Sequence, residues 1–250
     1  MTCNIAINGF FGRMGQSIFE ASINHRDVRI SVGCDVEEKI SSTQNTKDLI
    51  LTSQLQQQSD MFDVVIDFTL PESSIEVIKC CLVTNKPITI GTTGFTQEQK
   101  KFIKEASKKI PILIAPNMSQ GVNTSLDSLA SMAKSLRDYS VNIKEIHHVN
   151  KIDAPSGTAI KMAEVICESR GIDLGDVKSE TCPIKFESIR ERTEIGTHEV
   201  VFTNKSDEIR LIHIAKDRSI FANGAIETAK WINTQEAGLY TYHDYMVSTS

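Results

Sequence analysis

The sequence lacks an excess of positive charge and any apolar run long enough to span a membrane. Its 27 Lys and Arg residues are outnumbered by 32 Asp and Glu residues, and the formal net charge is -5. This balance excludes the basic surface that nucleic-acid partners require. The chain does not open with a basic segment followed by a signal-peptide core, so we expect a cytoplasmic protein without a membrane partner.

The chain also lacks a C-x-x-C pair, an internal repeat and a low-complexity linker. Because no two cysteines have this spacing, they form neither a zinc-binding pair nor a redox-active pair, and we predict no metal site. Most of them sit in apolar segments, which favours buried free thiols in a reducing compartment. The six cysteines are residues 3, 34, 80, 81, 167 and 182, and the main polar stretch runs from Ser41 to Ser59.

A glycine-rich turn follows the first apolar segment. Cys3 to Asn8 has the composition of a strand, and Gly9-Phe-Phe-Gly-Arg-Met-Gly15 leads directly into a helical pattern. In this order, glycines let backbone N–H groups approach a pyrophosphate, and Arg13 can add a charged contact. The spacing is G-x-x-G-x-x-G instead of G-x-G-x-x-G, so the motif alone is weak evidence for a dinucleotide site.

Asp35 ends a second predicted strand, Val28 to Cys34. It lies about 20 residues after the glycine turn, where a carboxylate can accept hydrogen bonds from the adenosine ribose. A carboxylate there repels a 2′-phosphate and therefore favours NADH, although Lys39 is near enough to admit NADPH. The alternative is a solvated aspartate at a strand end.

Three further apolar segments alternate with helical patterns, as in a βαβ series with a parallel sheet. The predicted strands are Val64 to Phe68, Pro87 to Ile90 and Pro111 to Ala115, and the helices run from about Ser73 to Thr84 and from Thr96 to near Lys109. Ligands of such sheets bind at the carboxyl ends of strands. Gly91, Thr92, Thr93 and Asn117 follow strand ends and are candidate cofactor residues, with turn and capping chemistry as the alternative.

The second half has a different pattern. Predicted helices at Gly121 to Arg137, Ser156 to Ser169 and Phe221 to Thr234 accompany strands at Val141 to His148 and near 183–190, 197–204 and 208–215. Successive strands without intervening helices predict a mostly antiparallel sheet. The fold class is therefore α/β, with a Rossmann-like parallel-sheet nucleotide domain over 1–118 and 222–250. Residues 119–221 form an α+β domain, which we expect to serve substrate binding and oligomerisation.

The segment from Glu145 to Ala159 concentrates groups that transfer protons and bind anions. His147 and His148 are adjacent and point to opposite sides of an extended strand, and Lys151 follows them. A lysine in a partly closed site can have its pKa lowered toward neutrality and then donates protons efficiently. Ser156-Gly157-Thr158 begins a helix, whose first N–H groups favour a carboxylate. The alternative is a structural histidine pair beside an ordinary helix cap.

On these residues the sequence resembles the dihydrodipicolinate reductase family, also called 4-hydroxy-tetrahydrodipicolinate reductases. The resemblance covers nearly the whole chain. The matching motifs are Gly9-Phe-Phe-Gly-Arg-Met-Gly15, Asp67-Phe-Thr69, Gly91-Thr-Thr-Gly-Phe95, Ala115-Pro-Asn-Met118, Gly121-Val-Asn123, Glu145-Ile-His-His148, Lys151-Ile-Asp-Ala-Pro-Ser-Gly-Thr158, Gly196-Thr-His198 and Phe221-Ala-Asn-Gly224. The chain departs from the family at Phe10 and Phe11, which replace small residues, and at a shortened loop, Asp176 to Cys182.

The resemblance implies hydride transfer from NADH or NADPH to a cyclic dicarboxylate, with loss of water, in diaminopimelate and lysine biosynthesis. It makes His147 the acid/base and Lys151 the proton donor, with His148, Gly157 and Thr158 binding the substrate carboxylates. It also implies a homotetramer formed through the substrate-domain sheets. The implied cofactor residues are Gly9, Phe10, Phe11, Gly12, Arg13, Met14, Asp35, Gly91, Thr92, Thr93, Ala115, Pro116, Asn117 and Met118.

Two other functions remain open on the sequence. Another two-domain NAD(P)-dependent dehydrogenase would explain the first half equally well, but it leaves the segment from 145 to 158 unexplained. A nucleotide-binding sensor without activity would have no use for His147 and Lys151 together.

Overall fold

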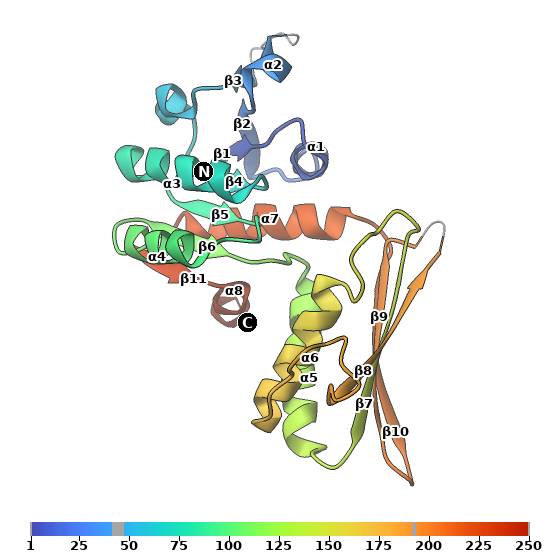
Figure 1. Cartoon of the computed structure of the whole chain (residues 1–250). Coiled ribbons are helices and arrows are strands. Elements are labelled where there is room, and N and C mark those ends of the chain that lie inside the picture. Colours follow the sequence, from blue (N-terminus) through green and yellow to red (C-terminus); the bar gives the residue numbers. More distant parts are fainter. Residues whose placement is uncertain (1, 42–47, 192–193, 250) are drawn as a thin grey trace. The chain divides into compact units, whose positions relative to one another are not determined.

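The predicted strand, glycine turn and helix at the N-terminus are confirmed in the computed structural model, which describes residues 2–41, 48–191 and 194–249 (Figure 1). The chain divides into two units. Unit 1 comprises Met1–Ser119 and Ser219–Ser250, and unit 2 comprises Gln120–Arg218. Part of the polar stretch expected from Ser41 to Ser59, residues 42–47, lies outside the described residues.

Unit 1 contains a parallel sheet in the order β11-β6-β5-β4-β1-β2-β3. The six strands β3, β2, β1, β4, β5 and β6 follow one another in the order found in doubly wound dinucleotide-binding folds. The strands are β1 (Cys3–Asn8), β2 (Val28–Cys34), β3 (Ile50–Thr52), β4 (Val64–Asp67), β5 (Ile88–Ile90), β6 (Pro111–Ile114) and β11 (Gly238–Tyr240). Each neighbouring pair runs parallel.

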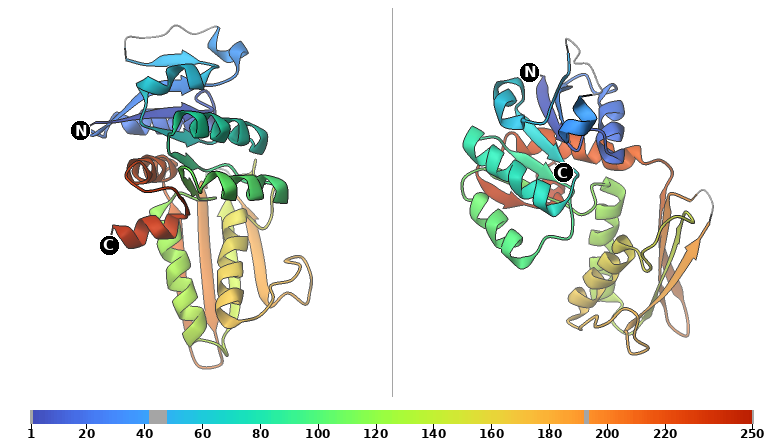
Figure 2. Two further views of the ribbon diagram at one scale, coloured as in Figure 1. Left: turned by 90° about the vertical axis from the view of Figure 1, so that its left-hand side faces the viewer. Right: turned by 45° about the horizontal axis from the view of Figure 1, so that its top comes forward.

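Helices cover both faces of this sheet (Figure 2). One face packs on α1, α7 and α8, and the other on η1, α3 and α4. Because both faces are covered, the central strands are apolar throughout instead of alternating. The helices are α1 (Arg13–Ser22), α2 (Glu37–Ile40), the 3-10 helix η1 (Leu55–Met61), α3 (Pro71–Thr84), α4 (Gln97–Ala106), α7 (Ser219–Ile232) and α8 (Tyr242–Ser248).

Unit 2 contains a four-stranded sheet in the order β10-β9-β7-β8. Its strands are β7 (Ser140–His147), β8 (Ile184–Arg190), β9 (Gly196–Thr203) and β10 (Glu208–Ala215). The predicted mostly antiparallel arrangement is confirmed: β9 is antiparallel to both β7 and β10, whereas β7 and β8 are parallel.

Two helices, α5 (Gln120–Ser135) and α6 (Gly157–Arg170), pack on one face of this second sheet (Figure 1). Val141 and Ile143 of β7 and Val200 and Phe202 of β9 point toward them and are buried. Since side chains alternate along a strand, Glu145, His147 and His198 continue the same inward face at one end of the sheet. This end of the sheet carries the polar site.

Candidate active site and cofactor site

The glycines of the first turn allow α1 to approach β1 closely. A Cβ atom on Gly15 would lie 2.4 Å from the carbonyl oxygen of Gly9, and Gly9 itself has a φ of +81°. Gly12 is the N-cap of α1, and in the described chain no side chain caps that position. Because of this, the helix presents its first N–H groups to an anion, as a pyrophosphate site requires. The residues thus fit a dinucleotide.

Phe10 and Phe11 differ in their surroundings. Phe10 is buried, and its ring packs edge-on against Phe11 and Phe19 at centroid distances of 5.2 and 5.4 Å. Its N–H donates to Cys34 O and its carbonyl accepts from Gln16 Nε2. Phe10 therefore fills the core beneath the turn, which explains how the turn accommodates a large residue there.

Asp35 organises the start of the cofactor region. Its Oδ2 accepts a hydrogen bond from the N–H of Phe11 at 2.9 Å, and its Oδ1 accepts from the N–H of Val36 at 2.9 Å. Lys39 forms an ion pair with Oδ1 at 3.0 Å, and its side chain is half-exposed. The carboxylate thus joins the glycine turn to α2 and carries a cation beside it.

A cavity of about 970 Å³ adjoins these groups, within the size range of cofactor sites. The predicted cofactor residues Gly9, Gly12 and Asp35 line it, and η1 and α3 form much of its wall. Sequence reasoning missed this wall, because the stretch before β4 reads only as polar. The additional lining residues include Asn8, Lys39, Gln54, Leu55, Gln56, Gln57, Thr69, Glu76, Val77 and Cys80.

Asp67 holds together three strand ends at the same sheet edge. Its side chain is fully buried, and all four donors to its two oxygens are neutral. Oδ1 accepts from Asn8 Nδ2 and Thr69 Oγ1, both at 2.7 Å, and Oδ2 accepts from Thr92 Oγ1 at 2.8 Å and from Ser74 Oγ. The predicted cofactor residue Thr92 is therefore held by Asp67, for which no role was predicted, and by the N–H of Thr69, which donates to its Oγ1 at 2.9 Å.

The other predicted cofactor loops lie at neighbouring strand ends. Gly91 packs under the Phe68 ring, where a Cβ atom would come within 2.1 Å of ring carbon Cε1. Asn117 accepts a hydrogen bond from the N–H of Ser119 through its side chain, and Met118 lies against Gly224 of α7. Thr93, Ala115 and Pro116 occupy the same two loops.

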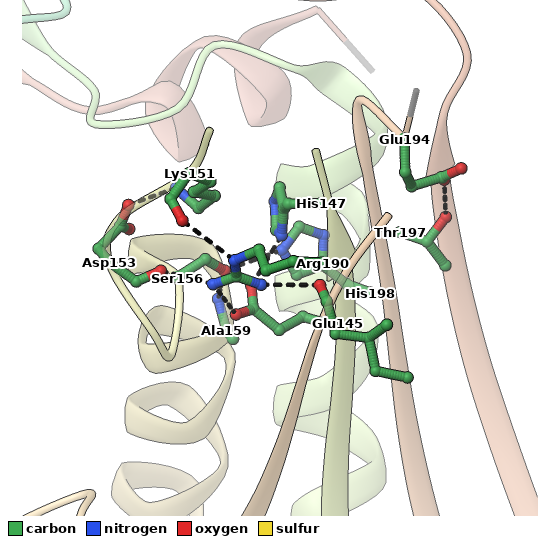
Figure 3. Close-up of polar contacts among 11 residues, drawn as sticks. Glu145, His147, Lys151, Asp153, Ser156, Ala159, Arg190, Glu194, Thr197 and His198 are labelled. Atoms are coloured by element: carbon green, nitrogen blue, oxygen red, sulfur yellow. Dashed lines mark hydrogen bonds and ion pairs between the residues drawn. The ribbon is translucent and has the colours of Figure 1, made fainter. Parts of the chain in front are cut away.

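In unit 2, Glu145 and His147 form the centre of a polar cluster (Figure 3). His147 Nδ1 lies 2.9 Å from Oε2 of Glu145, and Arg190 Nη2 donates to Oε1 at 3.1 Å. Burial by itself would raise the pKa of Glu145. The polar side chains of His147, Ser156, Ser188 and Arg190 around the carboxylate outweigh burial and hold that pKa well below its usual range. Glu145 is therefore ionised, and the guanidinium of Arg190 balances its negative charge.

His198 is the second imidazole of the cluster. Its ring meets that of His147 edge-on at 5.0 Å, and its Nε2 shares a hydrogen bond with Ser156 Oγ at 3.1 Å. Burial and then the neighbouring His147 lower the pKa of His198 to about 4, so it is neutral at physiological pH. The ligand atoms of Glu145, His147 and His198 lie within 4.8 Å of one another, but the Arg190 guanidinium beside Glu145 opposes a metal cation there.

The loop after β7 carries Lys151, whose Nζ forms an ion pair with Asp153 Oδ1 at 2.8 Å (Figure 3). Arg190 donates from Nε to the Lys151 carbonyl at 3.2 Å and from Nη2 to the Asp153 carbonyl at 2.6 Å. The predicted residues His147 and Lys151 thus lie at one end of the sheet. Arg190 contacts both Glu145, beside His147, and the Lys151 loop, and this contact was not predicted from the sequence.

The predicted carboxylate-binding residues begin the next helix. Ser156 is the N-cap of α6, as predicted, and its Oγ accepts from the N–H of Ala159 at 3.2 Å. Gly157 borders open space, since within the described chain a Cβ atom there would meet no atom within 4 Å. Thr158 follows it, and His148 directly follows β7; both are half-buried. The helix start therefore adjoins the imidazole and lysine groups.

None of the helices in the described residues has the length and apolar character needed to cross a membrane. The cysteines of the described chain are free thiols, and three of them, Cys34, Cys81 and Cys167, are buried. Burial raises the pKa of the Cys34 thiol to about 12, which makes it a poor nucleophile.

Comparison with known proteins covers both halves of the chain. The family model for the N-terminus of dihydrodipicolinate reductase matches residues 3–118, and that for its C-terminus matches residues 121–246. A 4-hydroxy-tetrahydrodipicolinate reductase from Hahella chejuensis (strain KCTC 2396) is 38% identical, over 97% of this chain and 98% of the relative.

The fold is also found in solved structures. A dipicolinate-bound dihydrodipicolinate reductase from Paenisporosarcina sp. TG-14 matches with a TM-score of 0.83 and 26% identity, over 96% of this chain and 98% of that one. An amine dehydrogenase from Mycobacterium smegmatis shares the fold at a TM-score of 0.68 with 9% identity, over 97% and 95% of the two chains. The matches to both halves and to the curated relative show that the chain belongs to the dihydrodipicolinate reductase family, the NAD(P)H-dependent oxidoreductases of diaminopimelate and lysine biosynthesis.

Proposed function

We propose that the chain reduces 4-hydroxy-tetrahydrodipicolinate to tetrahydrodipicolinate with loss of water, and that units 1 and 2 are its dinucleotide-binding and substrate-binding domains. The observation that carries this assignment is the cluster of His147, Glu145 and Lys151 beside the start of α6, in a member of this reductase family. A relative in the family has been solved with dipicolinate bound, which is a dicarboxylate of the same class.

In this proposal the substrate carboxylates bind to His148, Gly157 and Thr158. The first N–H groups of α6 and the positive end of its dipole favour anions, and Gly157 leaves space for them. His147 acts as acid and base through Nε2, since its Nδ1 faces Glu145. Lys151, held near the same strand end, donates the proton that balances hydride addition.

The cofactor would be held by the turn from Gly9 to Met14, by Asp35, and by the loops at Gly91–Thr93 and Ala115–Met118. The nicotinamide supplies the hydride, while the protein contributes orientation and proton transfer. We propose that NADH is favoured through Asp35 and that NADPH is also used, because Lys39 places a cation 3.0 Å from that carboxylate. Lys39→Met should then raise the KM for NADPH and leave the KM for NADH close to that of the unmodified protein.

We also propose a homotetramer formed through the outer face of the unit 2 sheet. Ile212 and Ile214 of β10 point away from the helices, and each is 54% exposed. Exposed β-branched residues spaced two apart on a strand form an apolar stripe that a second sheet can cover. Sedimentation of Ile212→Lys should give a species of lower mass than the unmodified protein.

The reductase assignment is tested by following nicotinamide absorbance while the preceding synthase makes the substrate in situ from pyruvate and aspartate semialdehyde. NADH or NADPH oxidation that needs both the synthase and this protein is the expected result. If a folded protein that binds NADH oxidises neither cofactor, a non-catalytic sensor or a dehydrogenase for another substrate becomes the better assignment.

A further inference from the structure

Glu145 is an ionised side chain with no exposed surface, on the inner face of β7. A buried charge is costly unless it is paired and hydrogen-bonded, so a fold retains one where its partners need it. Each of its two oxygens has a different partner. Oε2 faces His147 Nδ1 at 2.9 Å, and Oε1 accepts from Arg190 Nη2 at 3.1 Å.

The contact with Glu145 sets the tautomer of His147. A carboxylate can only accept hydrogen bonds, so the proton of a neutral imidazole is placed on Nδ1 and Nε2 is left as the basic atom. His147 Nε2 lies over Gly196 at the start of β9, where an added Cβ atom would come within 3.1 Å of it. The absence of a side chain at Gly196 therefore keeps the reactive nitrogen uncrowded.

Arg190 connects this pair to the loop of Lys151. Its guanidinium donates to the carbonyls of Lys151 and Asp153, at 3.2 and 2.6 Å, and also to Glu145. One rigid, planar group thus contacts both the carboxylate behind His147 and the backbone that carries Lys151. The two groups that move protons in the proposed function share this single support.

We propose that Glu145 and Arg190 are positioning residues of the reaction: Glu145 fixes the tautomer and orientation of His147, and Arg190 sets the Lys151 loop against them. This inference rests on the proposed function. When Nε2 of His147 takes up a proton, the resulting imidazolium keeps its Nδ1–H donated to Glu145, whose negative charge balances it. No proton passes to Glu145, because the contacts described above keep that carboxyl ionised.

The first test is Glu145→Gln, which keeps the volume but removes the charge and offers an N–H donor to Nδ1. We expect kcat to fall by about 10²-fold or more, the range of acid–base contributions, with the substrate KM within about 3-fold. The matched control is Glu164→Gln on α6, which removes the carboxylate of a half-exposed ion pair with Lys161 and should leave kcat unchanged. A kcat for Glu145→Gln within 3-fold of the unmodified protein would falsify the proposal.

A second readout needs no turnover. In substrate-free protein labelled with ¹⁵N-histidine, side-chain chemical shifts at pH 9 should show that the neutral imidazole of His147 carries its proton on Nδ1. In Glu145→Gln the proton should move to Nε2 or exchange between the two nitrogens. An unchanged tautomer in the variant contradicts the assigned role of Glu145. Absence of turnover in the unmodified protein would overturn the proposed function. The NMR result would then still test, independently, whether Glu145 sets the tautomer of His147.

Arg190→Lys separates the two halves of the proposal and serves if Glu145→Gln fails to fold. Lysine keeps a cation near Glu145 but cannot reach the carboxylate and both loop carbonyls together. We expect kcat to fall about tenfold, with the Nδ1–H tautomer of His147 preserved. A kcat equal to that of the unmodified protein means that Arg190 does not position the Lys151 loop.

Discussion

Replacing Asp67 with asparagine tests how the strand ends that carry the proposed cofactor loops of unit 1 are held together. In the folded protein the two carboxylate oxygens accept four hydrogen bonds, from Asn8, Thr69, Ser74 and Thr92. Asparagine keeps one of these oxygens and replaces the other with a donor. Two of the four bonds therefore lose their acceptor, while the shape of the side chain is unchanged.

The expected cost follows from these two bonds. A hydrogen bond to a charged group contributes about 1.5–3 kcal/mol, so the loss lies between about 3 and 6 kcal/mol. If the hydroxyls facing the new amide turn and accept from it, they recover part of this. We therefore expect the free energy of unfolding to fall by about 3 kcal/mol, the low end. With the amide nitrogen in place of Oδ2, Thr92 loses its bond to residue 67 and keeps only the one from the N–H of Thr69, so NADH binding should weaken about tenfold, which is about 1.4 kcal/mol.

Urea denaturation measures the first quantity, and quenching of Trp231 fluorescence or energy transfer to bound NADH measures the second. Asp63→Asn is the matched control. Asp63 precedes the same strand at its opposite end and accepts from the N–H and the side-chain amide of Asn4, at 2.8 and 3.2 Å. This control should lose some stability but keep the NADH affinity of the unmodified protein.

Two results would refute the reasoning. If Asp67→Asn unfolds at the same urea concentration as the unmodified protein, the four bonds contribute no net stability. If it is destabilised but binds NADH with unchanged affinity, Asp67 supports the sheet edge without positioning the Thr92 loop for the cofactor.

Three further outcomes are expected. Between pH 6.5 and 4, His198 binds a proton in the unfolded chain but not in the folded protein. The free energy of unfolding should therefore be unaffected by His198 above pH 6.5 and should fall by about 3 kcal/mol as the pH is lowered to 4. Urea titrations across this range should show a smaller pH dependence of that free energy in His198→Gln. Gly196→Ala should lower kcat/KM with an unchanged circular dichroism spectrum, because its methyl group crowds His147 Nε2 at 3.1 Å. Phe10→Ala should cost about 3 kcal/mol in urea and Phe11→Ala clearly less, since only Phe10 is buried; equal losses would contradict the core role of Phe10.

The sequence was sufficient to predict elements whose own residues determine them. The strands at Cys3–Asn8 and Val28–Cys34 are confirmed residue for residue, and the helix predicted to begin at Ser156 has that residue as its N-cap. In contrast, β3 and β11 have three residues each and form only by adding to β2 and β6. Both segments are only partly buried, unlike the equally short β5, which is buried throughout, so their strand structure depends on partners elsewhere in the chain.

The candidate site divides in the same way. His147 and Lys151 stand in one short motif, and Glu145 could have been recognised as an acidic residue two positions earlier on the same strand face. Arg190 reaches Glu145 from 45 residues away, and the Ser156–His198 contact spans 42 residues. These contacts depend on the register of β7 with β8 and β9, which a single sequence does not specify. Asp67 and Asn8 meet for the same reason, through the parallel register of β1 and β4.

The insertion of unit 2 between β6 and α7 sets an order for synthesis on the ribosome. Unit 2 is continuous from Gln120 to Arg218, whereas unit 1 needs residues from both ends of the chain. Until α7 and β11 emerge, one face of the parallel sheet is covered only by α1, and the outer edge of β6 has no partner. The nascent chain can therefore complete unit 2 while its first 119 residues still await the C-terminal segment, and in that interval a chaperone has an exposed sheet edge to protect.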